Sequence, residues 1–130
     1  MSQEVVCSIC SREKKQDVGL IPARQRYLGT HISLVEGKAA RRNLSFFILS
    51  GARGLIPGDE CIPYYDYLLE ADKAPELAEL IQLQLSAYNI SKVYFYTKLK
   101  PNWEPYLEAL RIGADASGVE LSTNELAEND

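Results

Sequence analysis

The feature that most constrains the fold is a short, unbroken apolar run from Phe46 to Leu49, which stops at Ser50 and Gly51. The run combines aromatic and β-branched side chains and is bounded by turn residues. Such a run is typical of a strand that is buried on both faces, as strands are in a parallel sheet. We therefore expect a parallel sheet with this strand inside it.

The remaining elements alternate in type along the chain. Apolar patterns predict further strands over residues 4–9 and 91–97 and a short edge strand over 119–122. Helical spacing predicts helices over 32–42, 75–88 and 103–112. This alternation predicts a three-layer α/β/α domain with a mostly parallel sheet of three to four strands. We expect residues 1–123 to form this single domain and residues 124–130 to be an acidic, disordered tail.

Composition fits one ordinary globular domain. A chain of 130 residues can bury a real core but has no room for a second domain. No apolar run approaches the length of a membrane span, and the N-terminus lacks the form of a signal peptide. Three cysteines, an odd number, argue against a disulfide framework. We therefore predict a cytoplasmic protein that does not bind membranes.

The charge is divided unevenly along the chain. Residues 1–56 hold nine Lys or Arg and four acids, whereas residues 57–130 hold five Lys or Arg and fourteen acids. The basic half suggests an anionic partner such as a nucleotide or nucleic acid. Alternatively, the acids simply form a solvated face on the later helices, and the sequence leaves both interpretations open.

The segment after the central strand is the first candidate site. In open α/β sheets, ligands lie beyond the carboxyl ends of the strands, and Ser50–Gly54 occupies this position. Gly51 and Gly54 permit close approach of a ligand to the backbone. Arg53 offers a planar fork of donors for phosphate or carboxylate. The alternative is a plain turn with a solvated arginine.

Two further segments add polar groups to this site. Ser11 and Lys14 follow the first strand and should lie at the same sheet edge as Arg53. The connection after them interleaves Arg24, Arg26 and Tyr27, a pattern suited to phosphate contacts plus base stacking. The plainer interpretation is that the arginine stems pack while their charged ends are solvated.

A tyrosine cluster follows the central stretch. Tyr64 and Tyr65 can stack on bases and hydrogen-bond through their hydroxyls, or can simply pack over the sheet edge. Asp66 beside them is the best candidate for a catalytic general base, although it can equally cap a helix.

The cysteines support a second, weaker hypothesis. Cys10, at a strand end near cations, becomes a reactive, catalytic thiol if these cations lower its pKa. Cys7, Cys10, Cys61 and His31 together provide just enough ligands for one zinc ion. Cys7 better suits a small core residue and His31 a surface or capping residue, so we predict no metal and no cofactor.

The first half of the chain, up to Leu69, resembles known families. The string ILSGARGLIPGDECIPYY resembles a segment of the YaaA peroxide stress resistance family. It is still more similar to a family of small bacterial domains with S-A-K-x-G-L and P-Y-D motifs, which also carry C-S-x-x-K and P-A-x-x-x-Y. Here these last two correspond to Cys10–Lys14 and Pro22–Tyr27. The resemblance implies an α/β domain distantly similar to uracil-DNA-glycosylase-like domains, associated with nucleic acids or modified bases. Arg53 and the short length depart from the family pattern.

Together these patterns predict a domain that binds a nucleotide or nucleic acid at the carboxyl edge of its sheet. The resemblance adds a link to base modification or repair. The alternatives are a metal- or redox-linked stress domain that uses its cysteines, and a non-catalytic protein-interaction module, with a homodimer left open. No paired carboxylates or nucleophile–base pair is visible in the sequence, so we predict no particular reaction.

Overall fold

A five-stranded sheet forms the centre of the protein in the computed structural model, which describes residues 2–65, 67, 69–98 and 100–126. The strand order is β4 (Gly54–Pro57), β3 (Ser45–Ser50), β1 (Gln3–Ile9), β6 (Ile90–Thr97) and β7 (Glu120–Glu125). β3, β1, β6 and β7 are parallel, and only β4 runs antiparallel to its neighbour β3. The predicted α/β class with a mostly parallel sheet is confirmed.

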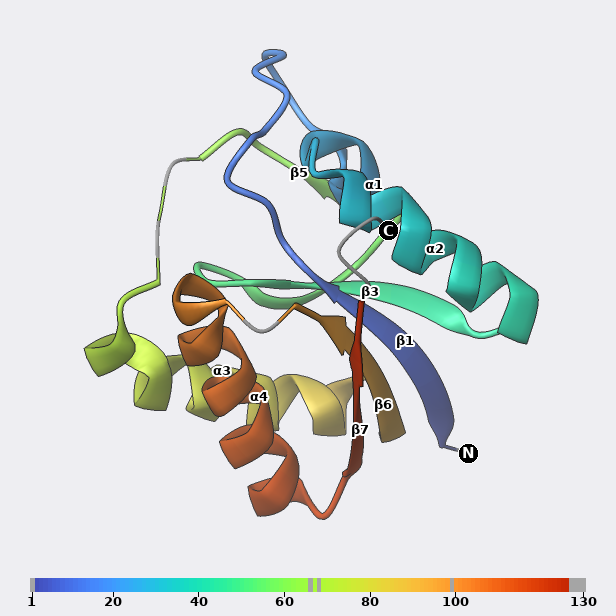
Figure 1. Ribbon diagram of the computed structural model, residues 1–130, viewed down its shortest axis with the longest axis vertical. Helices are drawn as coiled ribbons and strands as arrows, with labels where there is room; N and C mark the ends of the chain where they lie inside the picture. The colour runs from blue at the N-terminus through green and yellow to red at the C-terminus, as the bar shows by residue number, and fades with distance from the viewer. Residues whose placement is uncertain (1, 66, 68, 99, 127–130) are drawn as a thin grey trace.

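Helices cover both faces of this sheet (Figure 1). α2 (Thr30–Arg42) packs against β1 and β3 on one face. α3 (Ala74–Ala87) and α4 (Glu104–Ser117) pack against each other and against the opposite face. Two 3₁₀ turns, Ala71–Lys73 and Pro101–Trp103, lead into α3 and α4. The helix predicted over residues 103–112 continues further, because α4 extends to Ser117 and is followed by Gly118, whose φ of 68° suits a glycine.

The strand order explains which helix lies on which face. Parallel strands are joined by right-handed crossovers, so the direction in which the chain moves along the sheet decides the face that the crossover covers. From β1 the chain passes through α2 to β3, the neighbour of β1 in one direction along the sheet. Later it reaches β6, the neighbour of β1 in the other direction. The helices α3 and α4 therefore lie opposite α2, and the direction of winding reverses between β1 and β6.

The core follows the alternation of side chains along the strands. In β1, Val5, Cys7 and Ile9 face the layer of α3 and α4, whereas Val6 faces the layer of α2. Cys7 is fully buried, which agrees with its prediction as a small core residue. Both faces of β1 are therefore buried, as expected for a central parallel strand.

The sequence prediction missed the strand β4. The Gly- and Pro-rich segment after Ser50 was predicted to be a loop, but it turns back to pair with β3, with Leu49 opposite Leu55. Gln84 of α3 fixes this hairpin, because its amide donates to the Arg53 carbonyl (2.9 Å) and accepts from the Leu55 N–H (2.7 Å). This tertiary contact has no local sequence signal.

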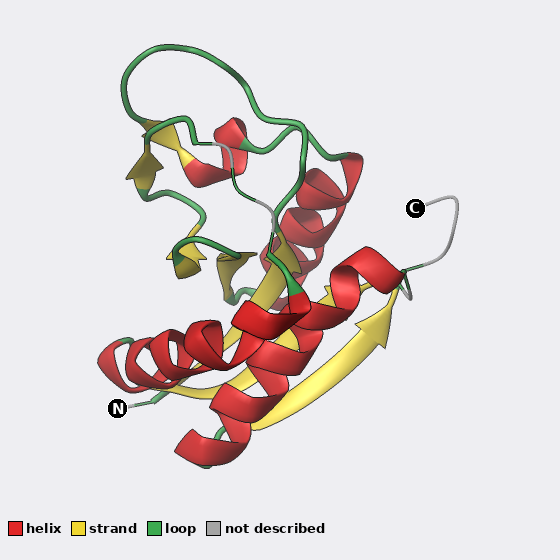
Figure 2. Cartoon of the chain, turned by 90° about the vertical axis from the view of Figure 1, so that its left-hand side faces the viewer, coloured by secondary structure: helices red, strands yellow, loops and turns green. Residues whose placement is uncertain are grey.

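A second, small sheet stands beside the main one, at the end of the molecule where the long loops gather (Figure 2). It pairs β2 (Ile21–Pro22) with β5 (Cys61–Ile62) in antiparallel fashion. The short helix α1 (Ala23–Arg26) follows β2 directly. No pattern in the sequence had predicted this subdomain.

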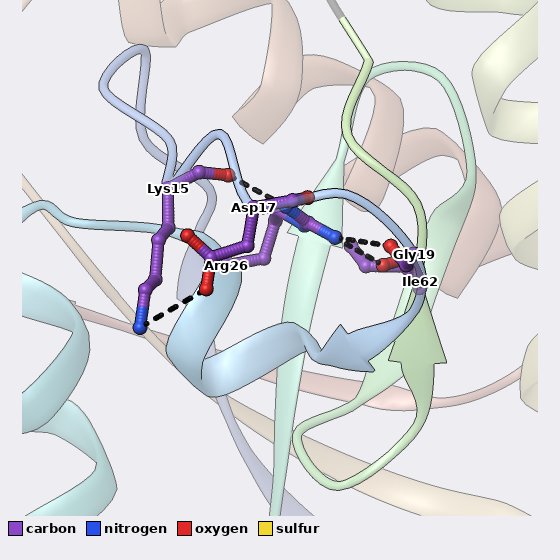
Figure 3. Close-up of polar contacts among 5 residues, drawn as sticks. All are labelled: Lys15, Asp17, Gly19, Arg26 and Ile62. Atoms are coloured by element: carbon purple, nitrogen blue, oxygen red, sulfur yellow. Dashed lines mark hydrogen bonds and ion pairs between the residues drawn. The ribbon is translucent and has the colours of Figure 1, made fainter.

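Arg26 holds this subdomain together (Figure 3). Its side chain is 0% exposed, and its guanidinium donates to four backbone carbonyls. Nη1 donates to Lys15 (2.6 Å) and Asp17 (3.0 Å), and Nη2 donates to Gly19 (2.7 Å) and Ile62 (3.0 Å). The planar fork of arginine suits this task because it spreads donors over several acceptors at once. Arg26 thus ties the loop after β1 to β5.

The carboxyl-terminal strand β7 lies at one edge of the main sheet. It extends to Glu125, and Leu126 is buried with its N–H bonded to the Thr97 carbonyl (2.8 Å). The tail predicted to begin at residue 124 therefore contains three residues that belong to the fold. Within the described part of the chain, no helix is both long and apolar enough to cross a membrane.

We predict that Arg26→Lys destabilises the protein by about 2–4 kcal/mol, because one ammonium group cannot serve four separated carbonyls and buried acceptors lose their partners. Chemical denaturation measures the free energy of unfolding. Arg24→Lys is the matched control: Arg24 makes exposed contacts with Asp59 (2.9 Å) and Glu36 (3.8 Å), so its change should stay within about 1 kcal/mol. Equal effects of the two substitutions would contradict the anchoring role of Arg26.

Candidate functional site

A cavity of about 560 Å³ lies where the winding of the sheet reverses, beyond the carboxyl ends of β1 and β6. This is the position at which doubly wound sheets bind ligands, because the connections leave it in opposite directions. Its walls come from the loop after β1, the start of α2, the loop after β6 and the start of α4. The lining residues are Ile9, Cys10, Ser11, Arg12, Glu13, Lys14, Gly29, Thr30, His31, Tyr67, Lys98, Lys100, Asn102, Trp103 and Tyr106.

The lining is strongly cationic. Arg12 and Lys14 come from the loop after β1 and Lys98 and Lys100 from the loop after β6, and among the described residues of the lining Glu13 is the one acid. The protein carries a formal net charge of −4, so this cavity is positive within a negative molecule. Charges that converge on a cavity with low-dielectric walls attract anions more strongly than the same charges spread over a surface.

Trp103 forms an aromatic wall of the cavity. The indole is half-buried, with the His31 ring 5.1 Å away at an interplanar angle of 53° and Lys100 Nζ 5.7 Å from the ring centre. Such an aromatic surface beside cations suits a ligand that combines a planar ring with negative charge.

His31 is fixed by the end of β1. Its Nε2 donates to the Ile9 carbonyl (2.9 Å) and lies 3.3 Å from the Cys10 carbonyl. The side chain is only 8% exposed, so the prediction of a surface histidine was wrong. Burial lowers the pKa of His31, and the charges of Lys98 and Lys100 lower it further, against the opposing effect of the two carbonyls.

A network of hydroxyl groups lies beside the cavity. The Tyr65 hydroxyl bonds to Ser50 Oγ (2.7 Å) and to the Tyr27 hydroxyl. Lys14 joins this network to the cavity, because its Nζ lies 4.9 Å from the centre of the Tyr65 ring. Burial raises the pKa values of Tyr27 and Tyr65, so both phenols stay protonated at neutral pH and act as hydrogen-bonding groups.

The loop 50–54 is not an open phosphate cradle. Ser50 Oγ accepts from the N–H groups of Ala52 and Arg53 (both 3.2 Å), which are the backbone donors that a phosphate would need. Gly51 packs under Tyr106, where an added Cβ would lie 3.2 Å from the hydroxyl oxygen. Arg53 is exposed and lies over Tyr65, with 5.7 Å from Cζ to the ring centre. Arg53 is thus the group of this loop best placed to meet a ligand.

The structure separates the remaining predicted site residues into three groups. Cys10, Ser11 and Lys14 line the cavity, and so do Lys98 and Lys100, which follow the strand predicted over residues 91–97. Ser50, Tyr27 and Tyr65 form the adjacent hydroxyl network, and Tyr64 is exposed. Arg24 and Arg26 lie elsewhere, in an ion pair with Asp59 and in the buried anchor respectively. The predicted catalytic residue Asp66 lies outside the described residues.

The cysteines do not come together. Cys7 is in the core, Cys10 is partly buried at the cavity, and Cys61 is exposed on β5. No group of three or more His, Cys, Asp or Glu side chains among the described residues is arranged to hold a metal ion. Burial raises the pKa of Cys10 despite the opposing effects of the Gly51 backbone and Lys14, the reverse of the shift that would activate its thiol.

Sequence reasoning missed His31, Trp103 and Tyr106 as cavity residues. Each belongs to a helix or to the turn before it. His31 was interpreted as a surface or capping residue, and Trp103 and Tyr106 were placed only within the helix predicted over 103–112. Their convergence depends on β6 lying directly beside β1, and the strand order cannot be deduced from periodicity. The signal that was available is the pair Lys98 and Lys100, which follows a predicted strand and precedes the chain's one tryptophan.

Searches against protein-family models, curated proteins and solved structures found no match.

Gly29, at the start of α2, makes room for the His31 ring. Its φ of −62° is open to any residue, but an added Cβ would lie 2.6 Å from His31 Cε1 and 2.8 Å from Ser11 Cβ. We expect Gly29→Ala to displace the ring and destabilise the protein by about 1–3 kcal/mol. Thermal and denaturant unfolding measure this effect.

Gly37 in the same helix is the control, because a Cβ there meets nothing within 4 Å. Gly37→Ala should stabilise the protein by about 0.5–1 kcal/mol through helix propensity alone. If Gly29→Ala stabilised the protein to the same extent, the close contact with His31 would be refuted.

Proposed function

We propose that the cavity between the ends of β1 and β6 binds a nucleotide. The observation that carries this proposal is the combination of four cationic side chains and one exposed aromatic wall in a single cavity of about 560 Å³. That volume lies within the range of small-molecule sites, roughly 300–1,000 Å³. Arg12, Lys14, Lys98 and Lys100 neutralise the phosphate groups, and the base stacks on Trp103.

Two lines of reasoning support a phosphate as the anion. Lys14 and the pair Lys98 and Lys100 approach from loops that follow two adjacent parallel strands, so they flank a bound group from both sides. Ammonium groups act as compact point charges that suit the several oxygens of a phosphate, without the planar match that a carboxylate makes with arginine. The resemblance of the first half of the chain to nucleic-acid-associated domains implies the same class of ligand.

The alternatives have less support. The redox hypothesis needs an activated thiol, whereas burial raises the pKa values of Cys7 and Cys10. The interaction-module hypothesis has two exposed tyrosines, Tyr64 and Tyr67, but the hydroxyl of Tyr65 is bonded to Ser50 and Tyr27 inside the protein. A nucleotide within a single strand of nucleic acid remains an outcome of the test below.

Trp103 is the only tryptophan of the chain, so its fluorescence reports on the cavity alone. We expect the four ribonucleoside monophosphates to quench this fluorescence saturably, and we expect the affinity to fall as salt increases. Pyrophosphate, which lacks a base, should compete for the site with little quenching. Short single-stranded DNA and RNA oligonucleotides, added to the same assay, show whether the nucleotide is recognised free or within a strand.

The double substitution Lys98→Gln, Lys100→Gln should weaken nucleotide binding by roughly 10- to 100-fold, since a charge-assisted hydrogen bond contributes about 1.5–3 kcal/mol. Lys92→Gln is the matched control. Lys92 lies near the start of β6. It is six residues before Lys98, so at about 3.3 Å per residue of a strand the two lie about 20 Å apart. Unchanged affinity in the double variant, or no binding of any nucleotide even at low salt, would refute the proposal.

A further inference from the structure

His31 presents one nitrogen to the protein and the other to the cavity. Nε2 faces the Ile9 and Cys10 carbonyls, at 2.9 and 3.3 Å. Because carbonyl oxygens only accept hydrogen bonds, Nε2 carries its hydrogen in both the neutral and the charged ring. The proton that His31 gains or loses therefore sits on Nδ1. The ring can therefore change its charge while Nε2 keeps its hydrogen bond to the Ile9 carbonyl.

The Nδ1 atom of the ring is not sealed inside the protein, because among the described residues only Arg26 Nε is a buried side-chain nitrogen or oxygen without a hydrogen-bond partner. His31 lines the cavity, and none of the described residues forms a hydrogen bond with Nδ1. Gly29 keeps this atom uncovered, since a Cβ at that position would lie 2.9 Å from Nδ1. A ligand atom can therefore approach the nitrogen that titrates.

Charged and titratable groups face His31 from each neighbouring segment. Those that line the same cavity are Cys10, Arg12, Glu13 and Lys14 after β1, Tyr67 between β5 and α3, Lys98 and Lys100 after β6, and Tyr106 of α4. Without an anion, burial and the two lysines after β6 disfavour the imidazolium. A bound dianion reverses this balance, because it offsets the lysine charges and offers oxygen acceptors to Nδ1–H.

We propose that His31 contacts the bound anion directly through a protonated Nδ1, so that the cavity takes up one proton together with its ligand. This inference rests on the proposed function, because it requires an anionic group in the cavity. His31 would then make the cavity discriminate between ligands by charge. A dianion accepts a hydrogen bond from the protonated Nδ1, and a neutral analogue does not stabilise this protonated form.

The linkage has a definite sign. If the anion favours the imidazolium, the pKa of His31 is higher in the complex than in the free protein. Affinity is then highest below the pKa of the free protein and decreases as pH rises toward the pKa of the complex. Each unit of difference between the two pKa values corresponds to a tenfold change in affinity, about 1.4 kcal/mol.

His31 is the only histidine in the chain, so its imidazole signals in an NMR spectrum need no assignment. The probe is sulfate, which keeps its two charges over the whole range in which a histidine titrates. Sodium chloride at the same ionic strength is the reference. We expect sulfate to raise the pKa of His31 by about one unit or more. The nitrogen shifts should show hydrogen on Nε2 in the neutral ring.

His31→Gln is the informative variant, because the glutamine amide nitrogen lies where Nε2 does and can still donate to the Ile9 carbonyl. This variant should bind sulfate with an affinity that no longer depends on pH over the range in which the wild type loses about tenfold. If His31→Gln does not fold, the titration of the wild-type histidine is itself the test.

The outcomes separate the two proposals. Sulfate binding that is lost in the Lys98→Gln, Lys100→Gln double variant, combined with an unchanged pKa of His31, would refute the role of His31 and leave the anion site standing. No sulfate or nucleotide binding at any pH would refute both. A pKa shift that persists at full size in the lysine double variant would support the contact with His31 but refute the role of Lys98 and Lys100 in holding the anion.

Discussion

The pairing of β1 with parallel neighbours on both sides is the constraint on which the rest of the structure depends. Both faces of β1 must then be covered, so α2 goes to one face and α3 and α4 go to the other. Because crossovers are right-handed, this division forces the connections at the carboxyl ends of β1 and β6 to diverge. The cavity is the space that this divergence leaves, and its chemistry comes from the residues that begin each connection.

The loop after β3 uses its polar groups in the opposite way to the loops after β1 and β6. After β3, the Ser50 hydroxyl satisfies the backbone N–H groups of the turn, and Gln84 fixes the hairpin that follows. After β1 and β6, lysine side chains line the cavity instead, with Lys14 and Lys100 beside the aromatic rings of Tyr65 and Trp103. Hydrogen bonds satisfied within the protein give rigidity, whereas donors left facing a cavity are available to a ligand. The loop after β3 is thus a rigid support for the loops that line the cavity.

The sequence was sufficient for elements whose signal is local. The apolar run at Phe46–Leu49 and the helical spacing between Pro75 and Tyr88 each predicted their element to within a few residues. It failed where a tertiary contact decides the outcome. Arg26 stands next to Tyr27 in the sequence, a pattern typical of phosphate-binding segments. In the structure its guanidinium is bonded instead to carbonyls of the loop 15–19 and of Ile62. No pattern in the sequence specifies those distant partners.

The composition of the edge strand β7 has a consequence for self-association. β7 has glutamates at both ends, Glu120 and Glu125, and polar residues at three of the four positions between them. If two copies joined their sheets antiparallel through this strand, each Glu120 would lie near the Glu125 of the other copy, and like charges across a strand pair are destabilising. The strand also offers little apolar surface to bury. This edge is therefore protected against sheet extension and aggregation, as natural sheets commonly are.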